Sequence, residues 1–300
     1  MIESIKEKSE LEKNNELESW EALQDLKEKI KENYPYLKMI ENQKEPITRW
    51  NREKPEISLT FDDGYGKWNI KEILDILENS EIQATFFILW DCLQLTPDLW
   101  KKAIDQWHQI CCHSFTHIYL SNKSDTTSLS SWLNKNVNIS TWQNNVKRLL
   151  WEDYYKQIKS ESWSNFPYQI KSDLLLETEI LMWEQQIKKT LWTEYFHKMK
   201  QNFPFFRFPG WCWATRPENI KVLKKLWYLS IWWSEDFYRN RKWNRHLSTD
   251  EIKNMNIWNW EIPLFHFKYQ DFKYINAYID NYKNKGKSSR KISDIVRPKN

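Results

Sequence analysis

EISLTFDDG, residues 56–64, is a short run of β-forming residues that ends in two adjacent carboxylates and a glycine. The apolar and branched side chains predict a strand, and Gly64 permits the sharp turn that aims Asp62 and Asp63 outward from its end. Adjacent carboxylates repel each other, so both stay ionised only where a cation or hydrogen-bond donors compensate. A DDG sequence by itself is more often a plain turn, and the surrounding chain therefore decides its meaning.

Helical and strand patterns alternate downstream of this strand. Apolar residues recur at helical spacing over residues 70–81, and QATFFILW at 83–90 is typical of a buried strand. A helix is predicted at 96–107, and HQICCHS at 108–114 predicts another strand. This order predicts parallel β/α units with right-handed crossovers, in which the active site gathers at the carboxyl ends of the strands.

The alternation is interrupted once and then resumes. Residues 121–172 are rich in Ser, Asn and Thr and then in aromatic and charged residues, which predicts a partly helical insertion. A long amphipathic helix is predicted at 174–191. The later segments again alternate strand and helix, at 203–210, 216–227, 228–236, 248–255 and 261–267. The sequence therefore predicts one α/β domain over residues 55–283.

The two ends of the chain differ from this domain. Residues 1–54 predict a helical extension and linker, with a solvated helix favoured over one that contacts a partner, because heptads are not sustained. Residues 284–300 predict a basic polar tail. No apolar run reaches the length of a membrane span, and the N-terminus lacks the apolar stretch of a secretory signal, which leaves the location open.

Composition excludes some classes and contains one anomaly. A formal net charge of +4 argues against a nucleic-acid binder built on a basic surface. Four irregularly spaced cysteines are too few for a disulfide framework. The chain holds 20 Trp and 4 Gly, whereas average usage would give about 21 Gly. Many tryptophans therefore stand where glycine is expected.

Polar residues fall at several predicted strand ends. His113 and His117 have the spacing of two ligands for one metal if their segment turns helically, and with a nearby carboxylate they predict a His₂Asp site with a position left for water. Arg207, between two phenylalanines, needs a carboxylate if buried, and Asp62 is the candidate. His266 by itself fits a core histidine better than a functional one; Asp236 is the carboxylate that could orient it.

The order of these motifs is more specific than any one of them. TFDDG, HSFTH, RFPG, WSED and LFH each end a predicted strand, and this series resembles the polysaccharide deacetylases, also called the NodB-homology or carbohydrate esterase family 4 fold. The resemblance covers roughly residues 55–283 without the insertion at 121–172. It implies a distorted (β/α) barrel that removes acetyl groups from sugars outside the membrane. The expected reaction is N-deacetylation of an N-acetylglucosamine polymer such as peptidoglycan, or of chitin-like oligomers.

The resemblance also implies a role for each matched residue. Asp63, His113 and His117 match the metal ligands, and zinc suits this ligand set best among divalent ions. Asp62 matches the base that deprotonates the attacking water, and Arg207 would hold Asp62 in place.

The remaining matches concern the leaving group and the substrate. His266 matches the general acid that protonates the leaving amine, and Asp236 would tune it. A backbone N–H near Gly210 would stabilise the oxyanion, Leu264 would line the acetyl pocket, and Trp233 matches a tryptophan of the family that borders the substrate.

Two departures from the family pattern keep alternatives open. Asp236 is followed by residues 237–240, FYRN, where the family usually continues to a second Asp and a Trp, and Cys112 stands where Asn is common. A catalytically idle relative that binds saccharides or partner proteins is the first alternative. An O-acetyl esterase acting on acetylated xylan would use the same residues and is the second.

The family pattern also gives the tryptophan excess a specific form. Several tryptophans fall on family glycines, many of them helix ends or turns where positive φ favours glycine: Trp90, Trp107, Trp211, Trp213, Trp227, Trp232 and Trp260. We expect that the codon UGA means glycine in the source organism and is written here as tryptophan. The alternative is a genuinely Trp-rich surface that binds carbohydrate.

Overall fold

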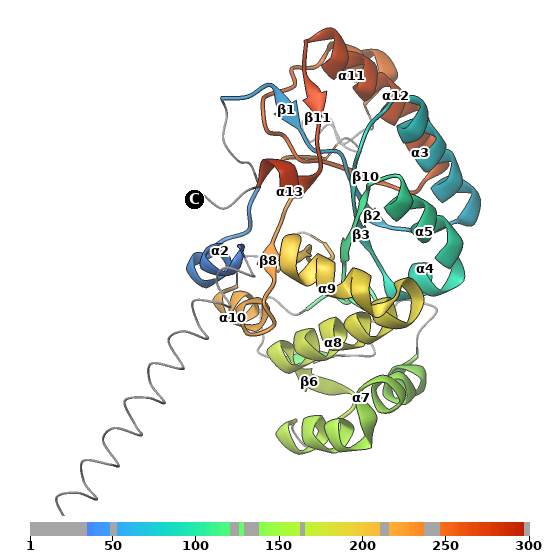
Figure 1. Ribbon diagram of the computed structural model, residues 1–300. Coiled ribbons are helices and arrows are strands. Elements are labelled where there is room, and N and C mark those ends of the chain that lie inside the picture. Colours follow the sequence, from blue (N-terminus) through green and yellow to red (C-terminus); the bar gives the residue numbers. More distant parts are fainter. Residues whose placement is uncertain are drawn as a thin grey trace, which may run out of the picture.

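The computed structural model describes residues 35–48, 53–120, 126–128, 138–162, 166–210, 216–236 and 247–296. Its centre is a parallel sheet with the strand order β8-β7-β4-β3-β2-β10-β9 (Figure 1). Among the described residues its edge strands β8 and β9 do not pair with each other, so the sheet is an open half-barrel. The strands are β2 (Thr60–Asp63), β3 (Thr85–Ile88), β4 (Gln109–Cys112), β7 (Phe205–Phe206), β8 (Leu229–Ser230), β9 (Glu235–Asp236) and β10 (Pro263–His266). The predicted α/β fold is confirmed.

The central strands are buried because helices cover the sheet. All four residues of both β3 and β4 are buried, as expected of parallel strands that are covered on both faces. Register then aligns the strand ends: His266 pairs with Asp62, Asp63 pairs with Ile88, and Ile88 pairs with Cys112. The residues that follow these strands therefore leave the sheet together, at the carboxyl ends of the strands.

Helices follow the outside of the half-barrel (Figure 1). The helix α3 (Lys67–Asn79) contacts α5 (Pro97–Asp105) and α12 (Tyr269–Asn284), and α12 contacts α11 (Thr249–Asn254). The long helix α8 (Ser172–Leu191) contacts several others: α4 (Trp90–Leu95), α5, α7 (Ile139–Glu161), α9 (Thr193–Asn202) and α10 (Pro217–Lys225). None of the described helices is long and apolar enough to cross a membrane.

The segments outside the predicted α/β alternation are described in part. Within residues 121–172, β5 (Thr126–Ser128) pairs antiparallel with β6 (Gln169–Lys171), and α7 packs against α8. In the N-terminal segment, α2 (Leu37–Asn42) is described, and Ile47 of the predicted linker bridges to Ile231 beside β8. The rest of the predicted helical extension, residues 1–34, lies outside the described residues.

The prediction of a polar tail at residues 284–300 is wrong for much of that segment. The strand β11 (Ser288–Ser289) pairs with β1 (Glu56–Ile57), and α13 (Ile292–Ile295) follows it. Ile292, Ile295 and Val296 are buried, because their close spacing places them on one side of a short helix. The basic charges around them obscured this apolar set in the sequence.

Positive φ values are concentrated at tryptophans and in the segments at the carboxyl ends of β2 and β4. Of the nine described non-glycine residues with positive φ, five are tryptophans: Trp107, Trp151, Trp192, Trp227 and Trp260. Trp151 and Trp192 combine it with ψ of 160° and 155°, a combination that is nearly exclusive to glycine. Three of the others are Asp63, Ser114 and His117.

Four helices end in the same hydrogen-bonded turn. In α3, α5, α10 and α12 the residue with positive φ donates to the carbonyl three residues back, and the next residue donates to the carbonyl five residues back, which is the Schellman pattern. The residues at the positive-φ position are Glu81, Trp107, Trp227 and Gly286. Trp107 and Trp227 therefore occupy the position that Gly286 occupies in α12.

Candidate active site

Asp62 and Asp63 lie at the carboxyl end of β2, between β3 and β10. Nη1 of Arg207 lies 2.8 Å from Oδ1 of Asp62, so the ion pair predicted from the sequence is present. The same nitrogen donates to Oγ1 of Thr60 at 2.8 Å, and the guanidinium carbon lies 4.1 Å from the centre of the Phe87 ring. The orientation of Asp62 is therefore determined by a buried cation that is itself fixed by the sheet.

A second group of side chains forms beside this pair. Ligand atoms of Asp63, His113 and His117 all lie within 4.8 Å of one another. Oδ1 of Asp63 is 3.5 Å from Nε2 of His113 and 3.3 Å from Nε2 of His117. Burial raises the pKa of Asp63, but hydrogen bonding and charge from the two imidazoles outweigh this effect and hold the pKa well below its usual range. The three residues form a His₂Asp cluster that can hold a divalent metal.

Two features of the cluster fit a cation. Nδ1 of His113 lies 2.9 Å from the backbone carbonyl of Arg207, and since a carbonyl only accepts, Nδ1 donates. In the neutral ring this leaves the lone pair of Nε2 facing the carboxylates of Asp63 and Asp62, the latter at 3.8 Å. In addition, Oδ1 of Asp63 is buried and forms no hydrogen bond of ordinary geometry with the described residues. A metal ion would satisfy both groups, and the backbone contact is typical of a ligating histidine.

The segment that carries the two histidines is a turn and not the helix that would suit their spacing. Ser114 has φ of 73° and His117 has φ of 58°. Oγ of Ser114 accepts from the backbone N–H of His117 at 3.1 Å, and Phe115, between them, is fully buried. Burial lowers the pKa of His117, but hydrogen bonding and charge from Asp63 outweigh it, so the pKa is raised. The turn, with Asp63 at φ of 78°, aims ligands from two strand ends at one point.

Other predicted site residues lie in β10 and β9, near the carboxyl ends of the strands. His266 pairs in register with Asp62 and acts electrostatically on Asp63, so the structure brings it to the site. Leu264, two residues earlier in β10, is buried and pairs with Asp236 of β9 as well as with Thr60. The side chain of Asp236 lies outside the description, so its predicted pairing with His266 stays a prediction.

The remaining predicted substrate residues follow β7 and β8. Gly210, with φ of 74°, ends the described part of the RFPG segment. Trp233 is buried, its ring stacks on Trp232 at 4.1 Å, and the guanidinium carbon of Arg207 lies 5.9 Å from its centre. The predicted glycine positions Trp211 and Trp213, and the altered fourth motif at 237–240, lie outside the described residues.

One buried carboxylate near the site was not predicted from the sequence. Glu179 of α8 accepts hydrogen bonds from the backbone N–H groups of Phe115 and Thr116, inside the histidine turn. Burial is the main influence on this group and raises its pKa to about 7. The available signal was its place four residues from both Leu175 and Trp183, on the apolar stripe of an amphipathic helix.

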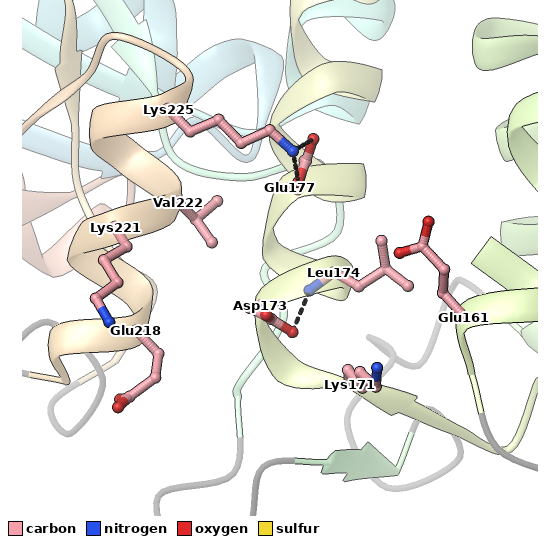
Figure 2. A pocket seen from close by; sticks show the side chains of 9 residues that line it. All are labelled: Glu161, Lys171, Asp173, Leu174, Glu177, Glu218, Lys221, Val222 and Lys225. Carbon is pink, nitrogen blue, oxygen red and sulfur yellow. Dashed lines mark hydrogen bonds and ion pairs between the residues drawn. The ribbon is translucent and has the colours of Figure 1, made fainter. Parts of the chain in front are cut away.

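A separate hollow lies between α7, β6, α8 and α10 (Figure 2). Its lining is mainly charged, and Nζ of Lys225 lies 2.7 Å from Oε1 of Glu177 across it. None of the predicted site residues lines it; the lining residues are Glu161, Lys171, Asp173, Leu174, Glu177, Glu218, Lys221, Val222 and Lys225. The hollow is therefore separate from the cluster at the strand ends.

Comparison with known proteins agrees with this geometry. Residues 49–145, which contain the DDG segment and both cluster histidines, match the family model described as polysaccharide deacetylase. This segment, about a third of the chain, is similar to polysaccharide deacetylases. A peptidoglycan-N-acetylglucosamine deacetylase of Bacillus cereus is 39% identical over 75 residues, which are 25% of this chain and 35% of that protein. The aligned parts cover between 15% and 35% of the first curated relatives.

Solved structures resemble a longer part of the chain. A family 4 carbohydrate esterase of Bacillus subtilis, PdaA, has a TM-score of 0.51 at 19% identity, covering 88% of this chain and 92% of that one. A CE4 family pseudoenzyme of Bacillus anthracis has a TM-score of 0.55 at 17% identity, covering 85% of this chain and 70% of that one. At such identities these likenesses show the fold alone.

Proposed function

We propose that this chain is a metal-dependent hydrolase that removes acetyl groups from a carbohydrate. Its preferred reaction is N-deacetylation of an N-acetylglucosamine polymer such as peptidoglycan, or of chitin-like oligomers. The proposal rests on two adjacent carboxylates that have different partners. Asp62 is paired with buried Arg207, whereas Oδ1 of Asp63 faces two histidines and has no hydrogen bond of ordinary geometry with the described residues. One carboxylate is thereby suited to proton transfer and the other to metal binding.

The residues divide the reaction between them. Asp63, His113 and His117 would hold a divalent metal, which when bound would supply Lewis-acid chemistry toward the acetyl carbonyl and water. Asp62 accepts a proton from the attacking water, with Arg207 keeping its oxygens in one orientation. His266, which pairs in register with Asp62, delivers a proton to the nitrogen as the carbon–nitrogen bond breaks. Acetate and the free amine are the products.

Two finer assignments belong to the same proposal. Zinc is the metal that we propose, because two imidazoles and one carboxylate form a common catalytic zinc set. The backbone near Gly210 and the side chains of Leu264 and Trp233 are proposed to bind the acetylated sugar. The buried position of Leu264 beside the strand ends supports an apolar acetyl pocket.

Acetate release from N-acetylglucosamine oligomers, with and without zinc, tests this function. We expect zinc-dependent release by the chain and release slower by roughly 10²- to 10⁴-fold in Asp62→Asn, while Asp62→Asn still binds metal. If the folded, zinc-loaded chain releases no more acetate than Asp62→Asn does, the result would support the idle, saccharide-binding alternative. One solved structure with a similar fold is a CE4 family pseudoenzyme. Release from acetylated xylan alone would identify an O-acetyl esterase.

We also propose that several tryptophans are glycines in the natural protein, with UGA translated as glycine in the source organism. Five described tryptophans have positive φ, and four of them expose at least a third of their surface: Trp107, Trp151, Trp192 and Trp227. The fifth, Trp260, is buried with an indole N–H that has no hydrogen-bond partner among the described residues. All five placements have a backbone conformation that favours glycine, and four of them leave a large part of the ring in solvent.

Other tryptophans provide the contrast that makes this proposal testable. Trp100, Trp142 and Trp183 are fully buried in helices, and each donates its indole N–H to an oxygen, at 2.8, 3.0 and 2.6 Å. We expect UGA codons at the five positive-φ positions and UGG codons at these three. UGG at all eight positions would reject the recoding and favour the Trp-rich alternative.

A further inference from the structure

The helix α8 places one buried carboxylate against the turn that carries both cluster histidines. Glu179 accepts from the backbone N–H of Phe115 at 3.1 Å and from that of Thr116 at 2.7 Å. The hydroxyl of Thr116 lies 3.1 Å and 3.0 Å from its two oxygens. The indole N–H of Trp142, in α7, donates to it at 3.0 Å. The carboxylate therefore connects the histidine turn to two helices that contribute no ligand.

The turn needs such a contact because its backbone is unfavourable. Ser114 and His117, at either side of Phe115 and Thr116, both have positive φ. Non-glycine residues keep such a conformation only where the surroundings over-determine it. Phe115 and Thr116 are buried, so the fold would be less stable if their backbone N–H groups had no acceptor. Glu179 is the acceptor for both, and it thereby stabilises the conformation that aims His117 at Asp63.

Among the described residues, hydrogen-bond donors and not a cation compensate the buried carboxylate of Glu179. Glu179 is fully buried, and no lysine or arginine in the described part of the chain forms an ion pair with it. Its compensation comes from four donors: two backbone N–H groups, one hydroxyl and one indole. Three of these four belong to the histidine turn. The contact is thus directed at the turn and does not serve to neutralise a distant charge.

We propose that Glu179 is a positioning residue that sets the affinity of the His₂Asp cluster for a divalent metal. The inference rests on the metal site of the proposed function. Glu179 does not touch the ligand atoms; it acts through the backbone of residues 115 and 116. The indole of Trp142 donates to Oε1 of this carboxylate, whereas the two backbone N–H groups of the turn donate to Oε2. Through this contact α7, in the segment that interrupts the β/α alternation, would contribute to the metal site.

A carboxylate on the same helix supplies a matched control. Glu184 is also buried, and it pairs with Nζ of Lys200 at 3.2 Å and with the hydroxyl of Tyr228 at 3.0 Å. Neither partner belongs to the histidine turn. Glu184→Gln removes a buried negative charge from α8, as Glu179→Gln does, and both variants are expected to lose stability. Only Glu179→Gln replaces an acceptor of the turn by an amide that cannot satisfy all of its donors.

The test is a titration of the metal-free full-length chain with Co²⁺, followed by visible absorption, after circular dichroism has verified that each variant is folded. We expect Glu179→Gln to bind Co²⁺ about 10- to 100-fold more weakly than the unchanged chain, with an altered absorption spectrum. Glu184→Gln is expected to bind as tightly as the unchanged chain. If Glu179→Gln does not fold, Thr116→Val, which removes the hydroxyl donor of the turn, takes its place and is expected to bind more weakly than Glu184→Gln.

The outcomes separate this inference from the proposed function. Co²⁺ affinity and spectrum that are unchanged in the folded Glu179 variant, or in Thr116→Val where that variant is used, would overturn the positioning role. Equal losses of affinity in the Glu179 and Glu184 variants would also overturn it, because the effect would then be a general one of stability. A chain that binds Co²⁺ tightly, loses affinity in Glu179→Gln and releases no acetate would support the inference while rejecting the deacetylase.

Discussion

Nη1 of Arg207 lies 2.8 Å from Oδ1 of Asp62, and the two side chains expose 0% and 3% of their surface. The guanidinium also donates to the carbonyls of Ile231 at 3.4 Å and Trp232 at 3.2 Å, beside its bond to Thr60. Contacts from β2, β7 and the end of β8 therefore hold one carboxylate in a single orientation. The neighbouring Asp63 has no such partner and faces the two histidines instead.

Removal of the carboxylate charge at Asp62 should separate proton transfer from metal binding. Asp62→Asn keeps the shape of the side chain but cannot accept a proton, so acetate release should fall by roughly 10²- to 10⁴-fold. Zinc and Co²⁺ binding should change little, because Asp63 and the histidines remain. Loss of metal in the folded variant would place Asp62 among the ligands.

Removal of the Arg207 guanidinium should destabilise the fold, because it leaves the charge of Asp62 buried without a partner. Arg207→Met should lower the free energy of unfolding by about 3–5 kcal/mol, measured by urea denaturation of the metal-free chain. Lys225→Met, which breaks the exposed ion pair with Glu177, is the control and should cost at most about 1 kcal/mol. Equal effects of the two substitutions would contradict the buried role of Arg207.

Metal should stabilise the folded chain through the cluster. A ligand that binds only the folded state at 100 times its dissociation constant adds about 2.7 kcal/mol to the free energy of unfolding, so zinc should raise Tm and a chelator should reverse the effect. His117→Ala should abolish this shift. His197→Ala, which changes an exposed histidine of α9, should preserve it. A zinc-dependent shift that survives in His117→Ala would place the metal elsewhere.

A buried histidine far from the proposed chemistry should make the fold sensitive to acid. Burial lowers the pKa of His108 to about 4, and Nδ1 accepts from the backbone N–H of Ala84 at 3.1 Å. The unfolded chain binds this proton more readily, so the stability contribution is complete above about pH 6.5 and is lost as the pH falls toward 4. Its size is roughly 3 kcal/mol at most.

Urea denaturation of the metal-free chain at pH 7.5 and pH 4.5 measures this effect. His108→Gln retains an acceptor for Ala84 but does not titrate, so its stability should fall less between the two values. Glu179 acts in the opposite sense, because its raised pKa removes stability as the pH rises toward 7. Comparison of the variant with the unchanged chain isolates His108; parallel losses in both would refute its role.

The free energy of unfolding should show whether tryptophan is strained at helix ends where positive φ favours glycine. Trp107 has φ of 66° and is 67% exposed, so Trp107→Gly should raise the free energy of unfolding by about 1 kcal/mol through relief of backbone strain. Gly286→Ala is the converse test in the same type of turn. Its φ is 68° and an added Cβ would meet nothing within 4 Å, so any loss, expected near 1 kcal/mol, is conformational. Destabilisation by Trp107→Gly would contradict this account.

Local signals were sufficient for most elements of the domain. Alternation of apolar strands with amphipathic helices predicted β2, β3, β4, α5 and α8 because each pattern repeats within a few residues. The same approach missed α13, where three apolar residues lie among basic ones. It also offered no sign of the turn with positive φ that brings His113 and His117 together, since their spacing suited one metal only if the segment were helical. Glu179 was missed because one carboxylate in an amphipathic helix has no local pattern that separates burial from exposure.

The sequence alone was enough to predict the alternation of the central strands and helices, the resemblance to a family, and a set of candidate site residues: Asp62, Asp63, His113, His117, Arg207 and His266. These conclusions depend on short-range periodicity and on motif order, which the chain carries in one dimension. Which carboxylate meets which partner depends on the tertiary structure. Asp62 faces Arg207 from 145 residues away, and Glu179 meets the turn at Thr116 from 63 residues away. Such contacts arise from strand register and helix packing, so they become visible only when the sheet is assembled.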